Sequence, residues 1–167
     1  DRWSAVPDIV TGGKALGGGT PIGYFSTTDR IAASYTRPGA STFGGNPVTA
    51  VAGLTVLRIL QRDGLVERAE QMGTWLKNRL LELQGRHSLV RGVRGEGMMI
   101  GAELSEKGEL TPAQVTDEVL ERLKDAGVLL GKTGPDRNVL TFMPPLIVER
   151  ADLGKAVDVL ENVLASI

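Results

Sequence analysis

The sequence predicts an α/β protein in two parts, a glycine-rich α/β segment over residues 1–85 and a compact α+β unit over residues 86–167. Short apolar runs alternate with stretches of helical periodicity, which indicates strands and helices in succession. Many of the 22 glycines fall within the first 50 residues. The composition changes between Gln84 and Ser88, and this change marks the predicted domain boundary.

The composition excludes several classes of protein. A chain of 167 residues with a net charge of −1 and 23% charged residues is neither a disordered chain nor a general nucleic-acid binder. No apolar run reaches the ~20 residues that a membrane-spanning helix needs. The chain has no cysteine and one histidine, His87, which argues against disulfides, thiolate nucleophiles and metal sites. No signal peptide is visible, so a cytoplasmic location is predicted, with an organelle as the alternative.

The first predicted elements surround a glycine-rich loop. Residues 7–11 and 22–26 are apolar enough to form two short strands, of which the first is expected to be buried. Glycine costs backbone entropy inside helices and strands, so residues 12–21 are predicted to be neither. The local arrangement is therefore a strand, a glycine-rich loop that carries Lys14, and a second strand.

A second glycine-containing loop, residues 41–47, leads into a helix. Asn46 followed by Pro47 is typical of a helix start, with a capping side chain and then proline in the first turn. This helix is apolar on most sides as far as residue 62, so we expect it to be buried. An amphipathic helix follows and is predicted to end at Gly85.

The rest of the chain alternates between strands and helices. Thr111 and Gln114 have the form of a capping box, which predicts a helix start, and Gly127 marks the end of that helix. A last apolar stripe predicts a helix from about residue 153 to residue 164. Four strands are predicted, over residues 90–95, 98–104, 128–130 and 139–142.

Lys14 is the first candidate for chemistry. It is one of six lysines and the one that lies among glycines between two apolar strands. Loss of hydration lowers the pKa of a lysine, and the neutral amine then reacts with an aldehyde to form a Schiff base. The alternative is an ordinary surface lysine in a flexible loop.

Ser41 and Thr42 form the second candidate site. Hydroxyl groups beside a glycine-rich turn that opens a helix are good phosphate ligands, because the helix N-terminus also favours an anion. The alternative is that the hydroxyls only cap a tight turn. A reactive lysine together with an anion site suits a phosphorylated aldehyde cofactor such as pyridoxal 5'-phosphate (PLP).

Four motifs in order resemble one family. Residues 7–23 contain PDIVT, KALGGG and PIG, residues 42–47 read TFGGNP, residues 94–101 read RGEGMMIG, and residues 138–146 begin with NVL and end with PPL. They are similar to the motifs of class III PLP-dependent aminotransferases of the alanine–glyoxylate, 4-aminobutyrate or acetylornithine type. The resemblance implies the C-terminal portion of a fold-type I PLP-dependent transferase. Residues 1–85 would end the large PLP-binding domain and include a long interdomain helix, and residues 86–167 would form the small α+β domain.

The resemblance also implies roles and partners. Lys14 would form the Schiff base with PLP and move the proton during catalysis, while Thr42, with Ser41 beside it, would bind the cofactor phosphate. In this family the threonine serves the active site of the partner subunit, so a homodimer with shared sites is implied. The reaction would move an amino group from an amino acid or ω-amine to a keto acid such as glyoxylate, pyruvate or 2-oxoglutarate. An aminomutase or racemase of the same fold, or a non-catalytic dimerising module, are the alternatives.

Two departures from the family pattern affect these expectations. Thr141 stands where the family usually has an arginine that binds the substrate carboxylate, and threonine cannot supply that charged fork. Arg137, four residues earlier, is the substitute we expect. The chain is also less than half the family length and lacks the segment that would hold the cofactor ring, so residues 1–167 alone are predicted to be inactive.

Overall fold

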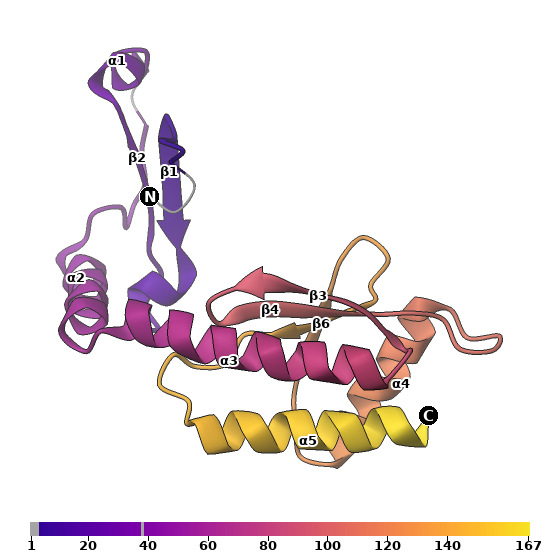
Figure 1. Cartoon of the computed structure of the whole chain (residues 1–167). Coiled ribbons are helices and arrows are strands. Elements are labelled where there is room, and N and C mark those ends of the chain that lie inside the picture. Colours follow the sequence, from indigo (N-terminus) through magenta and orange to yellow (C-terminus); the bar gives the residue numbers. More distant parts are fainter. Residues whose placement is uncertain (1–3, 38) are drawn as a thin grey trace. The chain divides into compact units, whose positions relative to one another are not determined.

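The computed structural model of the chain describes residues 4–37 and 39–167. They form two compact units that divide between Asp63 and Gly64, and each is described here by itself (Figure 1). The predicted boundary between residues 85 and 86 refers to the domains of a longer enzyme, and it stays a prediction.

The N-terminal unit begins with an antiparallel hairpin of β1 (Ile9–Gly13) and β2 (Gly23–Thr27), joined through the 3-10 helix η1 (Lys14–Gly17). The prediction that residues 12–21 avoid regular structure was wrong, because β1 continues through Gly13 and η1 follows at once. The predicted burial of the first strand was also wrong, since Ile9 is 53% exposed. No described residue of this unit covers the strand. A short helix, α1 (Asp29–Ala32), was not predicted.

The end of β1 needs glycine because the facing strand comes very close. A Cβ atom on Gly12 would lie 2.2 Å from the ring of Tyr24, and a Cβ on Gly13 would lie 2.9 Å from the carbonyl oxygen of Ile22. Real Cβ atoms do not approach other heavy atoms so closely. Gly13 therefore allows the two strands to approach closely, whereas the exposed Tyr24 side chain can turn away from a Cβ on Gly12.

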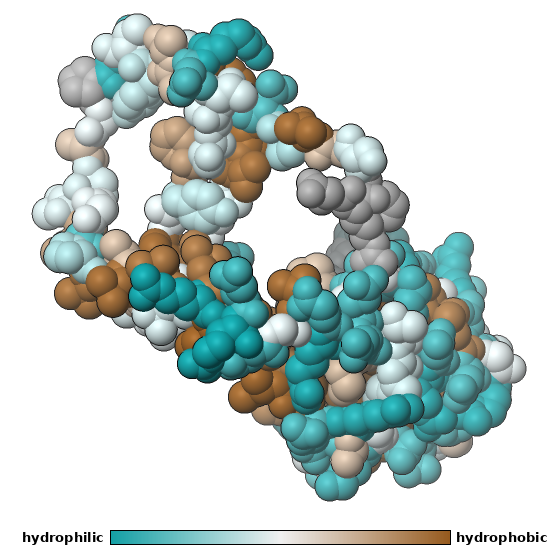
Figure 2. Space-filling view, turned by 60° about the vertical axis from the view of Figure 1, so that its left-hand side comes forward, coloured by the Kyte–Doolittle hydropathy of each residue, from teal (hydrophilic) through white to brown (hydrophobic). Residues whose placement is uncertain are grey.

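Helix α2 (Pro47–Arg62) starts as the sequence predicts. The Asn46 side chain accepts a hydrogen bond from the backbone N–H of Thr49, and Pro47 occupies the first turn. The predicted burial of this helix was wrong, since Gly53 is its one buried residue among those described. Figure 2 shows apolar side chains (brown) at the surface of this unit. The large apolar side chains exposed along α2 are Val48, Val51, Leu54, Leu57 and Ile59.

The C-terminal unit is an antiparallel four-stranded sheet in the order β3-β4-β6-β5, packed against helices (Figure 1). Its strands are β3 (Val90–Glu96), β4 (Met99–Leu104), β5 (Gly131–Thr133) and β6 (Val139–Phe142). Its helices are α3 (Leu65–Arg86), α4 (Pro112–Asp125) and α5 (Arg150–Ser166).

The sheet has one buried face and one open face. Alternate residues of β4 and β6 are buried and join the core formed with the three helices, as period-2 strands predict. The capping box at Thr111 is confirmed. The strand predicted at residues 128–130 was wrong, because Val128 and Leu130 pack against the core as a loop and pairing with β6 starts at Gly131. The residues that the sheet contributes to the core are Val90, Ile100, Ala102, Leu104, Leu140 and Phe142.

The contact between α3 and the β3–β4 turn gives a test of this packing. A Cβ atom on Gly73 would lie 1.9 Å from the carbonyl oxygen of Gly97, so Gly73→Ala is expected to destabilise the unit by about 3 kcal/mol. Gly85 lies in the same helix with nothing within 4 Å of such a Cβ, so Gly85→Ala should stabilise it by about 0.5–1 kcal/mol. Urea unfolding of both variants measures the difference. Equal stabilities would contradict the close helix–turn contact.

Among the described residues, no helix is both long and apolar enough to cross a membrane.

Candidate active site

Lys14 lies at the end of the hairpin with its backbone in an unusual conformation. Its φ angle is 54°, in the left-handed region that residues with a side chain rarely adopt. Such strained positions concentrate at functional sites. Two glycines precede Lys14 and Gly17 and Gly18 follow within the same turn, so the surrounding backbone tolerates this conformation.

The side chain of Lys14 is exposed. The expected shielding of Lys14 from water refers to the intact enzyme, and it stays a prediction. Within the N-terminal unit, the flanking strands present small or exposed residues, and no described residue of this unit lies over the hairpin end.

The loop of residues 41–46 is a tight turn that leads into α2. The backbone N–H of Gly44 donates to the carbonyl oxygen of Ser41 at 3.2 Å, and the side-chain N–H of Asn46 donates to the carbonyl oxygen of Phe43 at 2.8 Å. These bonds fix the turn and leave the side chains of Ser41 and Thr42 exposed. Their hydroxyls are accessible to a ligand.

The start of α2 contributes less to an anion site than the sequence suggests. Pro47 has no N–H to donate, and the N–H of Thr49 already donates to the Asn46 side chain at 3.0 Å. Two of the first three helical positions are therefore not free to bind a phosphate. An anion at this loop would depend chiefly on the hydroxyl groups of Ser41 and Thr42.

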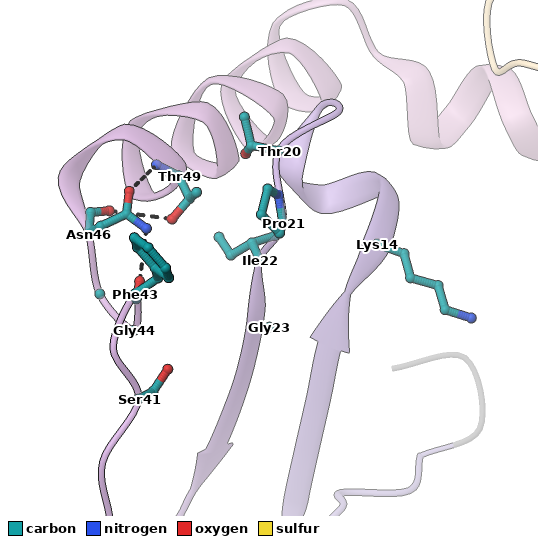
Figure 3. Close-up of a pocket in the computed structure, with 11 residues that line it drawn as sticks. Lys14, Thr20, Pro21, Ile22, Gly23, Ser41, Phe43, Gly44, Asn46 and Thr49 are labelled. Carbon is teal, nitrogen blue, oxygen red and sulfur yellow. Dashed lines mark hydrogen bonds between the residues drawn. The ribbon is translucent and has the colours of Figure 1, made fainter.

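An open depression of about 830 Å³ connects these parts of the unit. Figure 3 shows that the Lys14 side chain points away from Ser41, Asn46 and Thr49. The depression includes Ser41 but not Thr42 among its lining residues. Sequence reasoning missed Thr20 and Thr49, which carry no motif of their own. The lining residues are Lys14, Thr20, Pro21, Ile22, Gly23, Ser41, Phe43, Gly44, Gly45, Asn46 and Thr49.

The groups around the depression fit a phosphorylated aldehyde. An accessible primary amine can condense with a carbonyl group, and two exposed hydroxyls can bind phosphate oxygens. The volume also lies within the ~300–1,000 Å³ that is typical of small-molecule sites. Both Lys14 and Ser41 line the depression, but the Lys14 side chain points away from Ser41 (Figure 3).

The two residues considered for the substrate carboxylate lie in the C-terminal unit. Thr141 is half-buried on β6, and its hydroxyl oxygen lies 2.9 Å from that of Thr133. Arg137 is exposed in the preceding turn, with a φ angle of 53° and its backbone N–H bonded to the carbonyl oxygen of Gly134. They are therefore on different elements, and the structure does not bring Arg137 onto the strand.

An ion pair on the sheet gives a pH-dependent test. The Arg94 guanidinium bonds to the Glu103 carboxylate, which holds the pKa of Glu103 below its usual range. A lowered pKa stabilises the fold above the ordinary glutamate pKa of about 4.3, and this contribution is lost as the pH falls through the lowered value. Arg94→Gln should therefore reduce stability at about pH 7 and have much less effect at about pH 3. Urea unfolding at both pH values measures the loss of stability that the substitution causes. Equal losses at the two pH values would contradict this prediction.

Comparison with known proteins identifies the family. The model of the family described as "Aminotransferase class-III" matches residues 1–164. The chain is 40% identical over 164 residues to an alanine–glyoxylate aminotransferase 2 homologue, named as mitochondrial, from Arabidopsis thaliana, covering 96% of this chain and 34% of that protein. It is 35% identical over 167 residues to an acetylornithine aminotransferase from Caldanaerobacter subterraneus, covering 100% of this chain and 40% of that protein.

Solved structures of similar proteins also match almost the whole of this chain. A phospholyase from Arthrobacter in complex with phosphoethanolamine matches with a TM-score of 0.91 and 35% identity, over 98% of this chain and 40% of that one. An acetylornithine aminotransferase from Elizabethkingia anophelis matches with a TM-score of 0.85 and 27% identity, over 99% of this chain and 41% of that one. The chain thus spans well under half the length of the relatives it matches.

Proposed function

The chain belongs to the class III aminotransferase family, and from this premise we propose that it is the C-terminal part of a PLP-dependent aminotransferase. The family match over residues 1–164 carries the proposal, because it includes Lys14 and the loop at Ser41 and Thr42. Residues 1–85 would complete the cofactor domain and the long interdomain helix. Residues 86–167 would form the small domain.

PLP is the cofactor that the family implies. When bound, it supplies an aldehyde that links to an amine and a ring that withdraws electrons from the substrate. Lys14 would hold the cofactor through its Nζ atom, and Thr42, with Ser41, would donate hydroxyl hydrogen bonds to its phosphate. The accessible amine and hydroxyls described above support these assignments.

Lys14 would also act as a base in the reaction. Its Nζ atom would take a proton from a substrate carbon and return it to a different carbon. A neutral amine is required, so protein or cofactor must exclude water from Lys14. We propose that parts of the enzyme beyond this chain provide that cover.

A homodimer would account for the direction of the Lys14 side chain. The Lys14 side chain points away from the loop at Ser41, so each would serve a different cofactor molecule (Figure 3). A second subunit that presents its own loop to Lys14 would complete each site. The exposed apolar residues of α2 are a surface of the kind that subunit or domain contacts cover.

The proposed reaction moves an amino group from an amino acid or ω-amine to a keto acid. Alanine with glyoxylate, and acetylornithine with 2-oxoglutarate, are the first pairs to test because of the two relatives named above. An enzyme of the relatives' length that contains these residues should convert a donor only when a keto acid is supplied. Turnover of every donor without a keto acid would contradict amino transfer.

A lyase is the second candidate. The phospholyase structure matches with a TM-score of 0.91, whereas the transaminase structures that were compared match at 0.82 to 0.86. Thr141 also suits a substrate without a carboxylate. Elimination would break the carbon–oxygen bond to phosphate, and water would release the rest as an aldehyde and ammonia. Release of inorganic phosphate from phosphoethanolamine without a keto acid would favour this candidate over amino transfer.

The 167-residue chain alone is expected to transfer no amino group. Its Lys14 is exposed, and the described residues of the N-terminal unit offer no group over the hairpin end to hold the cofactor ring. A coupled assay for the keto-acid product, with PLP added, measures this. Turnover by the pure chain would contradict the need for the rest of the enzyme.

A further inference from the structure

The pairing of β5 with β6 ends within the C-terminal unit, and a pocket lies where it ends. Gly131 and Thr141 are the last paired residues at that end of the two strands. Beyond them the two segments no longer pair, and residues 128–131 and 141–145 both line the pocket, with the start of α5 completing its wall. Its volume of about 360 Å³ falls within the ~300–1,000 Å³ that is typical of small-molecule sites.

Hydrogen bonds hold both segments that line this pocket. The backbone N–H of Val128 donates to the carbonyl oxygen of Leu123, in the last turn of α4, at 2.8 Å. The Arg68 guanidinium of α3 donates to the carbonyl oxygens of Leu146 and Val148, at 3.1 and 2.8 Å. The pocket is therefore formed before a ligand arrives, and a preformed site binds at a lower entropic cost.

The walls of the pocket are almost entirely apolar. Apart from Gly131, Thr141 and Asp152, every residue that lines it has an apolar side chain. Two of these side chains are in contact with water, since Leu129 is 81% and Met143 is 61% exposed. A ligand with an apolar body would remove that surface from water, which stabilises the complex.

Asp152 supplies the charge at the pocket. Its side chain is 64% exposed, and within the described part of the chain its ion pair is with Lys155, at 3.4 Å. An exposed pair of this kind contributes little, so a cationic ligand can take the place of Lys155. The other charged residues at the start of α5 are engaged elsewhere, because Glu149 pairs with an arginine of α3 and the Arg150 guanidinium lies over the ring of Trp75.

We propose that this pocket binds a small amphipathic amine, with an aliphatic chain against the apolar walls and an ammonium group paired with Asp152. A carboxylate beside an apolar pocket favours a ligand that has an apolar body and one positive end. The same carboxylate repels a ligand whose end is negative. The inference does not rest on the proposed function, because neither Lys14 nor the loop at Ser41 contributes to this pocket.

The test measures binding to the 167-residue chain by amide chemical shifts in NMR, at about pH 7, where an alkyl amine is protonated. Hexylamine, hexanol and hexanoate are titrated separately at constant ionic strength. Saturable shifts are expected at Leu129, Met143 and Asp152, with hexylamine the tightest ligand and hexanoate the weakest. Propylamine should bind more weakly than hexylamine, by up to about fourfold for each methylene that no longer contacts the pocket.

Matched variants separate the charge from the apolar contact. Asp152→Asn should weaken hexylamine about threefold and leave hexanol unchanged, whereas Lys155→Gln should strengthen hexylamine because it frees the carboxylate. Leu129→Ala should weaken hexylamine and hexanol by the same factor. Asp158→Asn is the control, since Asp158 lies in the same helix but pairs with Arg79 at 3.1 Å and does not line the pocket.

Three results would overturn the proposal. The first is equal affinity for hexylamine and hexanol, and the second is an unchanged hexylamine affinity in Asp152→Asn. The spectrum of each variant shows that the unit is folded, so neither result can be attributed to unfolding. The third is a set of shifts at these residues that appears when the chain is concentrated without ligand and that hexylamine does not reverse, which would show that a second copy covers the pocket instead.

Discussion

Lys14→Ala is expected to abolish covalent attachment of PLP in an enzyme of the relatives' length that contains these residues. Lys14 is the one lysine in a glycine-rich turn, and its φ angle of 54° is a conformation that functional residues often adopt. Borohydride reduction fixes the link between an amine and the aldehyde. Mass spectrometry of the digested protein should then find the cofactor on the Lys14 peptide and, in the variant, on none.

Lys14→Arg makes the same test sharper. Arginine keeps the positive charge and the long side chain, but it stays protonated and cannot condense with an aldehyde. It should lose the covalent label as completely as alanine does, and activity should fall by at least about 10³-fold in both variants.

Lys107→Ala is the matched control. Lys107 is also exposed and lies in a turn, but it belongs to the C-terminal unit. Its variant should label at Lys14 like the unmodified enzyme. Cofactor attachment that persists in Lys14→Arg, or that is lost in Lys107→Ala, would show that Lys14 is not the cofactor lysine.

Local signals predicted the helices well. Asn46 and Pro47 start α2, and Thr111 with Gln114 starts α4, because capping depends on residues within one turn. The core strands β4 and β6 were also predictable, since buried positions alternate with more exposed ones along β4 and β6 is a short apolar run. In each case, the residues that determine the element lie within it or next to it in the sequence.

Features that depend on distant residues were not predictable. The predicted burial of α2 was wrong. An apolar helix has a surface that other protein usually covers, but its sequence does not identify the segment that does so. The strand expected at residues 128–130 failed because pairing with β6 selects residues 131–133 instead. The shielding of Lys14 stays a prediction, since no local pattern identifies a segment that would cover the hairpin end.

The candidate site likewise has one part that the sequence predicts and one part that it does not. The identity of Lys14, Ser41 and Thr42 follows from residue type and neighbouring glycines, which the sequence contains. The direction of Lys14 relative to Ser41 does not, because it depends on how the hairpin and the loop fold (Figure 3). From that direction we propose a site that is shared by two subunits.

Mixing two inactive variants is therefore expected to restore activity. If Lys14 and Thr42 act in one cofactor site but come from different subunits, a dimer of Lys14→Ala with Thr42→Ala has one site with both residues intact. Random exchange makes half of the dimers mixed, each with one of two sites intact, so about a quarter of the unmodified activity should return. Each variant alone should stay inactive or nearly so.

The control places both changes in one subunit. A mixture of Lys14→Ala with the double variant Lys14→Ala, Thr42→Ala contains no intact lysine, so it should recover nothing even though mixed dimers form. Native mass spectrometry verifies that the subunits exchange in both mixtures. If exchange is complete and the first mixture stays inactive, Lys14 and Thr42 belong to the same subunit's site. A site within one subunit would then require Lys14, which points away from Ser41, to change direction when the cofactor binds (Figure 3).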